Sequence, residues 1–228
     1  MIQRPIISAQ EAAAKVKECD TIMVAGFLGC GSPHTVIKAL RAAAPKQMTL
    51  VCNDTAIYDP KTGKTWGVAH LVVAKLLRKI ITSHIGLNQE SQRQMNEGET
   101  QIELVPQGTL VEQIRAGGAG LGGILTPTGV GTEVEQGKQI IDIGGRSYLL
   151  EMPLRANVAL IKAKTADKAG NLIYSATARN FNPIMATAAD LVIAEAEEIV
   201  EIGELDPNAI HTPFIFVDFL VKAESLDV

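Results

Sequence analysis

Residues 22–33 constrain the fold more than any other stretch of this chain, and they read IMVAGFLGCGSP. The first four are apolar, uncharged and half β-branched, a pattern typical of a parallel strand buried on both faces. Three glycines follow, and they can adopt positive φ and let a ligand approach the backbone closely. Ser32 is predicted to cap a helix that starts at Pro33. The stretch predicts a strand, a glycine loop and a helix N-terminus, the usual place for an anion in an open α/β sheet.

The glycine spacing is G-x-x-G-x-G, which leaves two interpretations open. It is neither the dinucleotide fingerprint G-x-G-x-x-G nor the phosphate loop that ends in Gly-Lys-Ser/Thr. The loop either binds a ligand or only turns the chain between a strand and a helix. Spacing by itself does not separate these two roles.

Composition excludes several classes of protein. The chain has 228 residues, 46% of them hydrophobic and 20% charged, with a net charge of −4. Without a basic cluster and with only 4% aromatic residues, it does not resemble a nucleic-acid binder. No apolar run is long enough to cross a membrane, and the N-terminal residues lack the pattern of a signal peptide. The four histidines show no metal-ligand spacing, so no metal site is predicted.

The cysteine count is odd, which favours a reducing compartment. Cys19, Cys30 and Cys52 show no zinc spacing, so we expect a cytoplasmic protein with free thiols. Cys30 lies in the glycine loop and is a candidate nucleophile. Because no histidine that could activate it is recognisable beside it, a small structural thiol is the favoured role.

Strands and helices are predicted to alternate through the first half of the chain. Ser8 and Glu11 form a capping box that opens a helix over 9–17. A second box, Thr109 with Glu112, is predicted to open a short helix. Such alternation indicates an open, largely parallel sheet flanked by helices. Further strands are predicted at 48–52, 80–85 and 102–105, and further helices at 34–44, 68–77 and 91–97.

The second half of the chain has a different pattern. Residues 117–123 hold five glycines between apolar flanks, which favours an ordered loop against a ligand or partner over a flexible linker. Residues 139–150 read as a β-hairpin with a two-glycine turn. Strands are predicted at 158–162 and 191–196, with a helix over 182–189. No linker is evident, so we expect one domain over 1–228 with a more mixed, β-rich C-terminal lobe.

Asn53 follows the predicted strand 48–52, at the edge where parallel sheets bind ligands. From the residues alone, it either contacts a ligand or forms a turn.

Several ordered motifs together resemble the alpha subunit of a two-subunit family I coenzyme A transferase, of the acetate or butyrate–acetoacetate kind. The resemblance covers nearly the whole chain. It departs from the family in having Glu18-Cys19 where Asp-Gly is usual, and Ala25 where the first glycine of Gly-Gly-Phe is usual. The motifs that carry the resemblance are 26–33, 53–55, 83–86, 106–110, 115–123, 126–132 and 179–183.

The resemblance implies that CoA moves from an acyl-CoA to a free carboxylic acid through a glutamyl-CoA thioester. In the family the glutamate lies in a Ser-Glu-Asn-Gly motif on the beta subunit, and this chain has no such motif. It therefore implies no catalytic nucleophile here, a beta-subunit partner in an α2β2 assembly, and CoA as substrate with no permanently bound cofactor. Asn53 and Gln107 match positions that face the reacting acyl group, where a carboxamide could hold a carbonyl or carboxylate without adding charge. The alternative for Gln107 is a loop residue whose side chain is satisfied by the backbone. The positions implied for CoA binding are Ala25, Gly26, Phe27, Leu28, Gly29, Cys30 and Gly31.

Two other functions compete with this interpretation. Sugar-phosphate-binding modules use a similar sheet, but they need catalytic acids or a DNA-binding segment of their own. A nicotinamide dehydrogenase would need the G-x-G-x-x-G fingerprint, which is missing.

Overall fold

The computed structural model describes residues 3–224, and within them the main sheet holds nine strands. Neighbouring strands along its path are all parallel, and β12 (Leu172–Ile173) pairs antiparallel with β11. The order across the sheet is β1 (Ile6–Ile7), β14 (Phe219–Lys222), β13 (Ala189–Val200), β11 (Ala156–Asp167), β2 (Thr21–Val24), β3 (Met48–Val51), β6 (Leu77–Thr82) and β7 (Gln101–Leu104). The predicted open, largely parallel sheet is confirmed.

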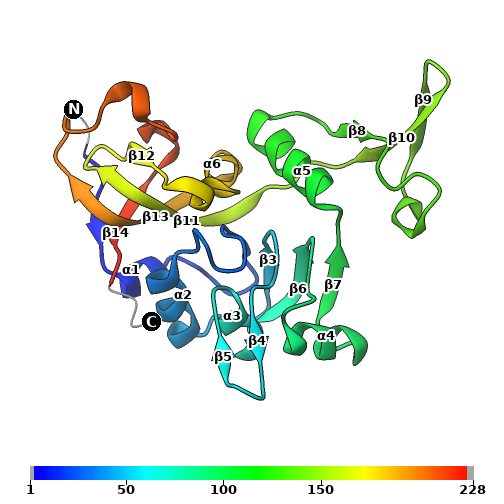
Figure 1. The fold of residues 1–228 in the computed structure, drawn as a ribbon, viewed down its shortest axis with the longest axis horizontal. Coiled ribbons are helices and arrows are strands. Elements are labelled where there is room, and N and C mark those ends of the chain that lie inside the picture. Colours follow the sequence, from blue (N-terminus) through cyan, green and yellow to red (C-terminus); the bar gives the residue numbers. More distant parts are fainter. Residues whose placement is uncertain (1–2, 225–228) are drawn as a thin grey trace.

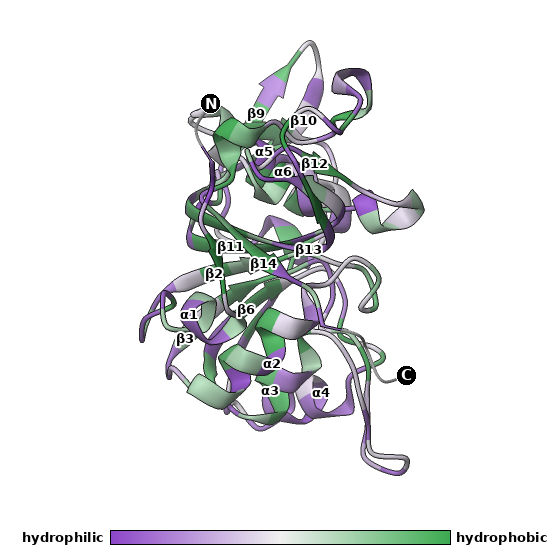
Figure 2. Cartoon of the chain, turned by 90° about the vertical axis from the view of Figure 1, so that its left-hand side faces the viewer, coloured by the Kyte–Doolittle hydropathy of each residue, from purple (hydrophilic) through white to green (hydrophobic). Residues whose placement is uncertain are grey.

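Helices cover both faces of this sheet (Figure 1). On one side lie α1 (Ala9–Ala13), α2 (His34–Ala43), α3 (Ala69–Val73) and α4 (Gln89–Asn96), and on the other α5 (Gln107–Ala119) and α6 (Asn182–Met185). Figure 2 shows the apolar strands between the two layers. Along β2, Ile22 and Val24 pack in the core on the α2 side, and Met23 packs in the core on the α5 side. This alternation explains why the strand is apolar throughout.

A smaller antiparallel sheet projects from the side of the main one (Figure 1). Its order is β8 (Ile124–Thr126), β10 (Arg146–Glu151), β9 (Ile140–Ile143). Gly144 and Gly145 both have positive φ in the β9–β10 turn, as the predicted two-glycine hairpin requires. The mixed strand arrangement expected for the C-terminal lobe is largely limited to this antiparallel sheet. The later strands β11, β13 and β14 join the parallel sheet. Short elements complete the chain: β4 (Tyr58–Asp59), β5 (Lys64–Thr65) and the 3₁₀ turns Glu133–Glu135, Ala176–Arg179, Pro207–Ala209 and Phe214–Phe216.

Several helix boundaries were predicted wrongly. The Ser8–Glu11 capping box is present, but its helix ends at Ala13. The segment 68–77 is not one helix, because Lys75 adopts a left-handed φ of 54° and the chain enters β6 two residues later. The helix predicted over 182–189 is limited to α6. No helix in the described part of the chain is long and apolar enough to cross a membrane.

Helix α5 corrects two further predictions. It begins at Gln107, so Thr109 is not its cap, and the Thr109 hydroxyl is buried without a partner among residues 3–224. Gly117 and Gly118 lie inside the helix rather than in a loop. A Cβ at 117 would lie 1.9 Å from the Leu154 carbonyl oxygen, so the helix packs too closely for a side chain there. It ends where Gly120 takes a φ of 69°.

Candidate active site

The glycine loop lies where the order of the main sheet reverses. From β2 the chain moves outward through β3, β6 and β7, while β11, β13 and β14 extend on the other side. The loop leaves the carboxyl end of β2, between these two halves. Open α/β sheets bind ligands in the crevice at such a switch point.

The tip of the loop is a two-residue turn. Phe27 N–H donates to the Cys30 carbonyl at 2.9 Å, and Cys30 N–H donates to the Phe27 carbonyl at 2.8 Å. The two central residues, Leu28 and Gly29, have φ of 48° and 87°, and such a turn favours glycine at both positions. Leu28 is held there because its N–H donates to Asp54 Oδ2 at 3.0 Å.

At the three glycines of the loop, neighbouring residues of this chain leave no room for a side chain. A Cβ at Gly26 would lie 2.0 Å from Ser32 Oγ, one at Gly29 would lie 1.9 Å from the Trp66 ring, and one at Gly31 would lie 2.6 Å from the Ala178 carbonyl oxygen. Within residues 3–224 no group accepts a hydrogen bond from the backbone N–H of these three glycines. The loop is therefore closely packed and still has three free donors.

The predicted cap of α2 is wrong. Ser32 Oγ donates to the Ala25 carbonyl at 3.0 Å, and α2 begins at His34 without a side-chain cap. Instead, the buried Glu195 accepts the Val36 N–H at 3.0 Å, and burial raises the pKa of Glu195. A carboxyl group of the chain itself therefore occupies the helix N-terminus that was expected to bind an anion.

Two asparagines fix the far side of the loop. Asn180 Nδ2 donates to the Cys30 carbonyl and Asn182 Nδ2 to the Gly31 carbonyl, both at 3.0 Å. Asn182 Oδ1 also accepts the Lys162 N–H of β11 at 2.7 Å. Neither asparagine was predicted as a site residue. Both lie in the motif 179–183 that carries the family resemblance, and this motif is the only sequence signal that could have indicated them.

The carboxamides of Asn53 and Gln107 meet directly. Gln107 Nε2 donates to Asn53 Oδ1 at 2.7 Å, and Ser83 Oγ lies 3.2 Å from the same oxygen. Asn53 is 1% exposed at the end of β3, whereas Gln107 is exposed at the start of α5. Of the two amide hydrogens on Gln107, one is used by Asn53 and one remains available to a ligand.

Asp54 links this pair to the glycine loop, and the sequence did not single it out. Its Oδ2 accepts from Leu28 N–H and from Asn53 Nδ2 at 3.2 Å, and its Oδ1 accepts from Ala56 N–H at 2.7 Å. Burial raises the pKa of the Asp54 carboxyl, while these hydrogen bonds lower it. One buried carboxyl group thus sets the positions of both predicted binding elements.

Two cavities flank the loop. A cavity of about 440 Å³ is lined by Phe27, Asn53, Gln107 and apolar residues of α5 and α6. A second cavity of about 520 Å³ is lined by residues 28–32, His34, Trp66, Lys162 and residues 175–178. Of the residues implied for CoA binding, Phe27 faces the first cavity and residues 28–31 face the second. Ala25 lies in the core, 1% exposed.

His34 in the second cavity supports the loop. Its Nε2 lies 3.0 Å from the Gly29 carbonyl oxygen, and its ring packs 4.4 Å from that of Trp66. Burial lowers the pKa of His34 to about 4, so it is neutral at pH 7 and can donate to that carbonyl. Cys30 is exposed, and its Sγ is 3.6 Å from Thr177 Oγ1.

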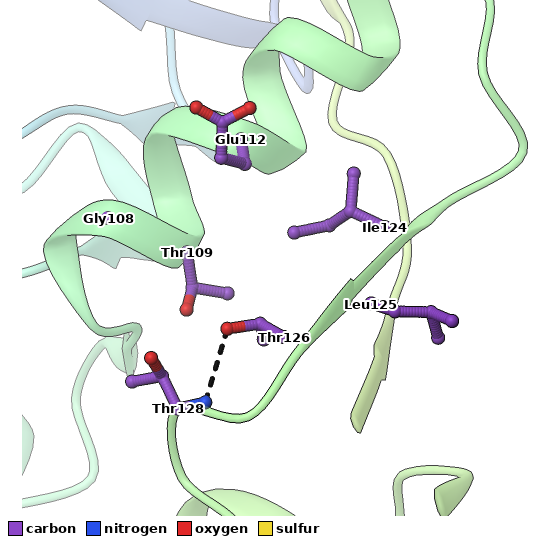
Figure 3. Close-up of a pocket in the computed structure, with 7 residues that line it drawn as sticks. All are labelled: Gly108, Thr109, Glu112, Ile124, Leu125, Thr126 and Thr128. Atoms are coloured by element: carbon purple, nitrogen blue, oxygen red, sulfur yellow. Dashed lines mark hydrogen bonds between the residues drawn. The ribbon is translucent and has the colours of Figure 1, made fainter. Parts of the chain in front are cut away.

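A third cavity of about 350 Å³ lies between α5 and β8 (Figure 3). Ile124 and Thr126 point from β8 toward Thr109 of α5, and Thr128 N–H donates to Thr126 Oγ1 at 3.2 Å. None of the predicted site residues lines it. It shares Gly108 and Glu112 with the cavity that contains Asn53 and Gln107, so the two cavities are adjacent.

Comparison with known proteins identifies the family. The profile described as coenzyme A transferase matches residues 6–223. The chain belongs to the coenzyme A transferase family. It is 48% identical over 219 residues to the alpha subunit of acetate CoA-transferase from Escherichia coli (strain K12), covering 96% of this chain and 97% of that one. It is also 48% identical over 218 residues to one subunit of a probable succinyl-CoA:3-ketoacid coenzyme A transferase from Bacillus subtilis (strain 168), covering 96% and 89%.

A solved structure supports the same fold for this coenzyme A transferase chain. It is a thioester complex with CoA of an acyl-CoA transferase from Escherichia coli O157:H7, similar with a TM-score of 0.85 at 22% identity. The match covers 97% of this chain and 47% of the other, so this chain spans about half the length of that protein. Family membership confirms the predicted coenzyme A transferase, and it disfavours the sugar-phosphate and nicotinamide hypotheses.

Proposed function

We propose that the chain is the alpha subunit of a two-subunit transferase that moves CoA between a short-chain acyl-CoA and a free carboxylic acid. The observation that carries this proposal is the Asn53–Gln107 pair, which lies beside a glycine loop with free N–H donors and lines a cavity. The two relatives described above are each named as a single subunit of their enzyme, which supports a separate partner chain.

The partner supplies a glutamate in this proposal. Its carboxylate attacks the thioester carbonyl carbon and expels CoA thiolate, which leaves a mixed anhydride. The thiolate then attacks the glutamyl carbonyl and releases the first acid. An acceptor carboxylate attacks the carbonyl of the resulting glutamyl-CoA thioester and expels the thiolate, which leaves a second mixed anhydride. The thiolate then attacks the acceptor's acyl carbonyl and releases the glutamate carboxylate. Each addition places negative charge on a carbonyl oxygen.

This chain stabilises and positions the reacting groups. The free Gln107 amide hydrogen, oriented by Asn53, donates to the developing oxyanion, and preorganised donors of this kind lower barriers strongly. The N–H groups of Gly29 and Gly31, which line the second cavity, bind CoA, with the backbone around them held by Asp54 and the two asparagines. CoA is a substrate here, and no permanently bound cofactor is part of the proposal.

Three free cysteines in the described residues support a reducing cytoplasm. An active site completed by a second chain supports an alpha–beta pair, and the heterotetramer of two such pairs is what the family resemblance implies. The test is to purify the chain alone and together with the product of an adjacent reading frame that carries Ser-Glu-Asn-Gly. We expect transfer of CoA from butyryl-CoA to acetate only with both chains. Turnover by the chain alone, free of partner, contradicts the proposal.

A further inference from the structure

The amino end of α5 opens into the third cavity without a cap. The helix begins at Gln107 after Pro106, and no side chain caps it. Within residues 3–224, no group accepts a hydrogen bond from the backbone N–H of Gly108 or Thr109, and both residues line the cavity between α5 and β8. The first N–H groups of a helix lie at its positive end, so this side of the cavity favours a negatively charged oxygen.

The Thr109 side chain is an independent sign of a ligand in the same cavity. Thr109 is 4% exposed, and its Oγ1 is buried without a hydrogen-bond partner in the described part of the chain. A buried hydroxyl without a partner is unfavourable, and an acceptor that enters the cavity relieves this cost. Figure 3 shows the hydroxyl groups of Thr109, Thr126 and Thr128 turned toward the same place between α5 and β8.

The opposite wall adds a further donor. Thr126 Oγ1 accepts the Thr128 N–H at 3.2 Å, so the hydrogen of the Thr126 hydroxyl is still available to a ligand. Two backbone N–H groups of α5, the Thr109 hydroxyl and the Thr126 hydroxyl therefore surround one cavity. A carboxylate matches this set of donors, because its two oxygens accept about four hydrogen bonds.

The lining restricts the charge of the ligand. The described residues that line the cavity include one carboxyl group, Glu112, and no lysine or arginine. Glu112 pairs with Arg115 at 3.1 Å, and Figure 3 shows its carboxylate turned away from the threonine hydroxyls. Without a cation in the lining, a doubly charged phosphate is poorly balanced here, whereas a single charge is held by the helix end and the hydroxyls. Ile124 points into the cavity and provides an apolar surface for the rest of the ligand.

We propose that the start of α5 and strand β8 form a binding site for the carboxylate of a small aliphatic acid, separate from the place where the thioester reacts. The two N–H groups and the two hydroxyls hold the carboxylate, and the aliphatic tail lies against Ile124. Gly108 and Glu112 also line the cavity that contains Asn53 and Gln107, so the bound acid lies beside that cavity without occupying it. This site does not depend on the proposed function, because its occupancy is measured without turnover.

The test titrates the full chain with sodium butyrate at constant ionic strength and measures binding by isothermal titration calorimetry. We expect saturable binding of butyrate and weaker binding of inorganic phosphate. Thr109→Val keeps the shape of the side chain and removes the hydroxyl, so it should raise the Kd for butyrate by about tenfold or more, the scale of a lost hydrogen bond to a charged group. Thr126→Val should raise this Kd as well.

A matched control is available at Thr55. Its side chain is fully buried, its hydroxyl also has no partner among the described residues, and it lines none of the three cavities. Thr55→Val should leave the Kd for butyrate unchanged. Because the Thr109 hydroxyl has no partner in residues 3–224, Thr109→Val should not lower the thermal stability of the chain without butyrate, which separates a lost ligand contact from misfolding.

Gln107→Ala distinguishes this site from the catalytic cavity. We expect butyrate binding to survive this change. If Gln107→Ala abolishes butyrate binding and Thr109→Val does not, the acid binds in the catalytic cavity and the proposed site is wrong. The proposal is also overturned if no saturable binding occurs, or if inorganic phosphate displaces butyrate at equal concentration. Each of these results leaves the proposed transfer of CoA unaffected, because that transfer is tested by turnover of the two-chain complex.

Discussion

Asn53 and Gln107 are 54 positions apart in sequence, yet their carboxamides form a 2.7 Å hydrogen bond. One side chain follows β3 and the other starts α5. The sheet brings them together because β3, β6 and β7 are successive parallel neighbours whose carboxyl ends lie at one edge. The pair leaves one Gln107 amide hydrogen free at the mouth of a cavity, which is the basis of the first prediction.

Gln107→Ala should lower kcat by about 10²- to 10³-fold in the assembled complex, the scale of losing one oxyanion donor. Gln107 is exposed in this chain, so folding and assembly should be unaffected. Steady-state kinetics with butyryl-CoA and acetate measure the effect. Gln10→Ala, an exposed glutamine of α1, serves as the control. A Gln107 variant with wild-type kcat would remove this side chain from the reaction.

Asp54→Asn should raise the KM for acyl-CoA and lower the free energy of unfolding by about 1–3 kcal/mol. Asp54 accepts three hydrogen bonds, and an amide nitrogen in place of one oxygen would face an N–H donor. Thermal unfolding and KM are both measured. The control is Asp59→Asn, in an exposed turn where the carboxylate accepts from Lys61 N–H, and it should leave KM unchanged. Equal KM values for both variants would contradict a positioning role for Asp54.

His34 should make stability depend on pH. Because burial lowers its pKa from 6.5 to about 4, the folded state binds fewer protons than the unfolded state between these values. The free energy of unfolding should therefore fall as pH drops through this window, by at most about 1.4 kcal/mol per pH unit. His34→Gln keeps an amide donor for the Gly29 carbonyl but does not titrate. Denaturant titrations of both proteins from pH 7.5 to 4 should diverge below pH 6.5, and parallel curves would refute the prediction.

Gly117→Ala should destabilise the chain by about 1–3 kcal/mol through overpacking, because the new Cβ would lie 1.9 Å from the Leu154 carbonyl oxygen. Gly108→Ala, in the same helix, meets nothing within 4 Å. Helix propensity should make that control neutral or stabilising by up to about 1 kcal/mol. Chemical denaturation compares the two. Similar losses at both positions would mean that α5 does not pack as described.

Cys30→Ala should retain most of the transferase activity. Residue Cys30 is exposed, and its Sγ lies 3.6 Å from Thr177 Oγ1. Chemistry in the proposed function depends on a glutamate of the partner. A loss of about 10³-fold or more in kcat, the scale of removing a nucleophile, would instead support a thiol mechanism.

The sequence by itself determined the local elements and the family. The apolar run 22–25, the Ser8–Glu11 capping box and the two-glycine hairpin follow from backbone preferences that act over a few residues, and the structure confirms them. Ordered motifs along the chain were specific enough to indicate a coenzyme A transferase. They also indicated Asn53 and Gln107, although not that the two side chains meet.

Only the tertiary structure decided how the loop is held. Asp54 was not predicted as a site residue, yet its carboxylate accepts the Leu28 N–H across 26 positions, and the Asn182 amide donates to the Gly31 carbonyl across 151. Gly117 was predicted to lie in a loop, but it lies inside α5, where the Leu154 carbonyl oxygen leaves no room for a side chain. Such contacts depend on which strands become neighbours and on where their ends meet. No periodicity within one segment encodes that arrangement, because it results from packing the whole sheet.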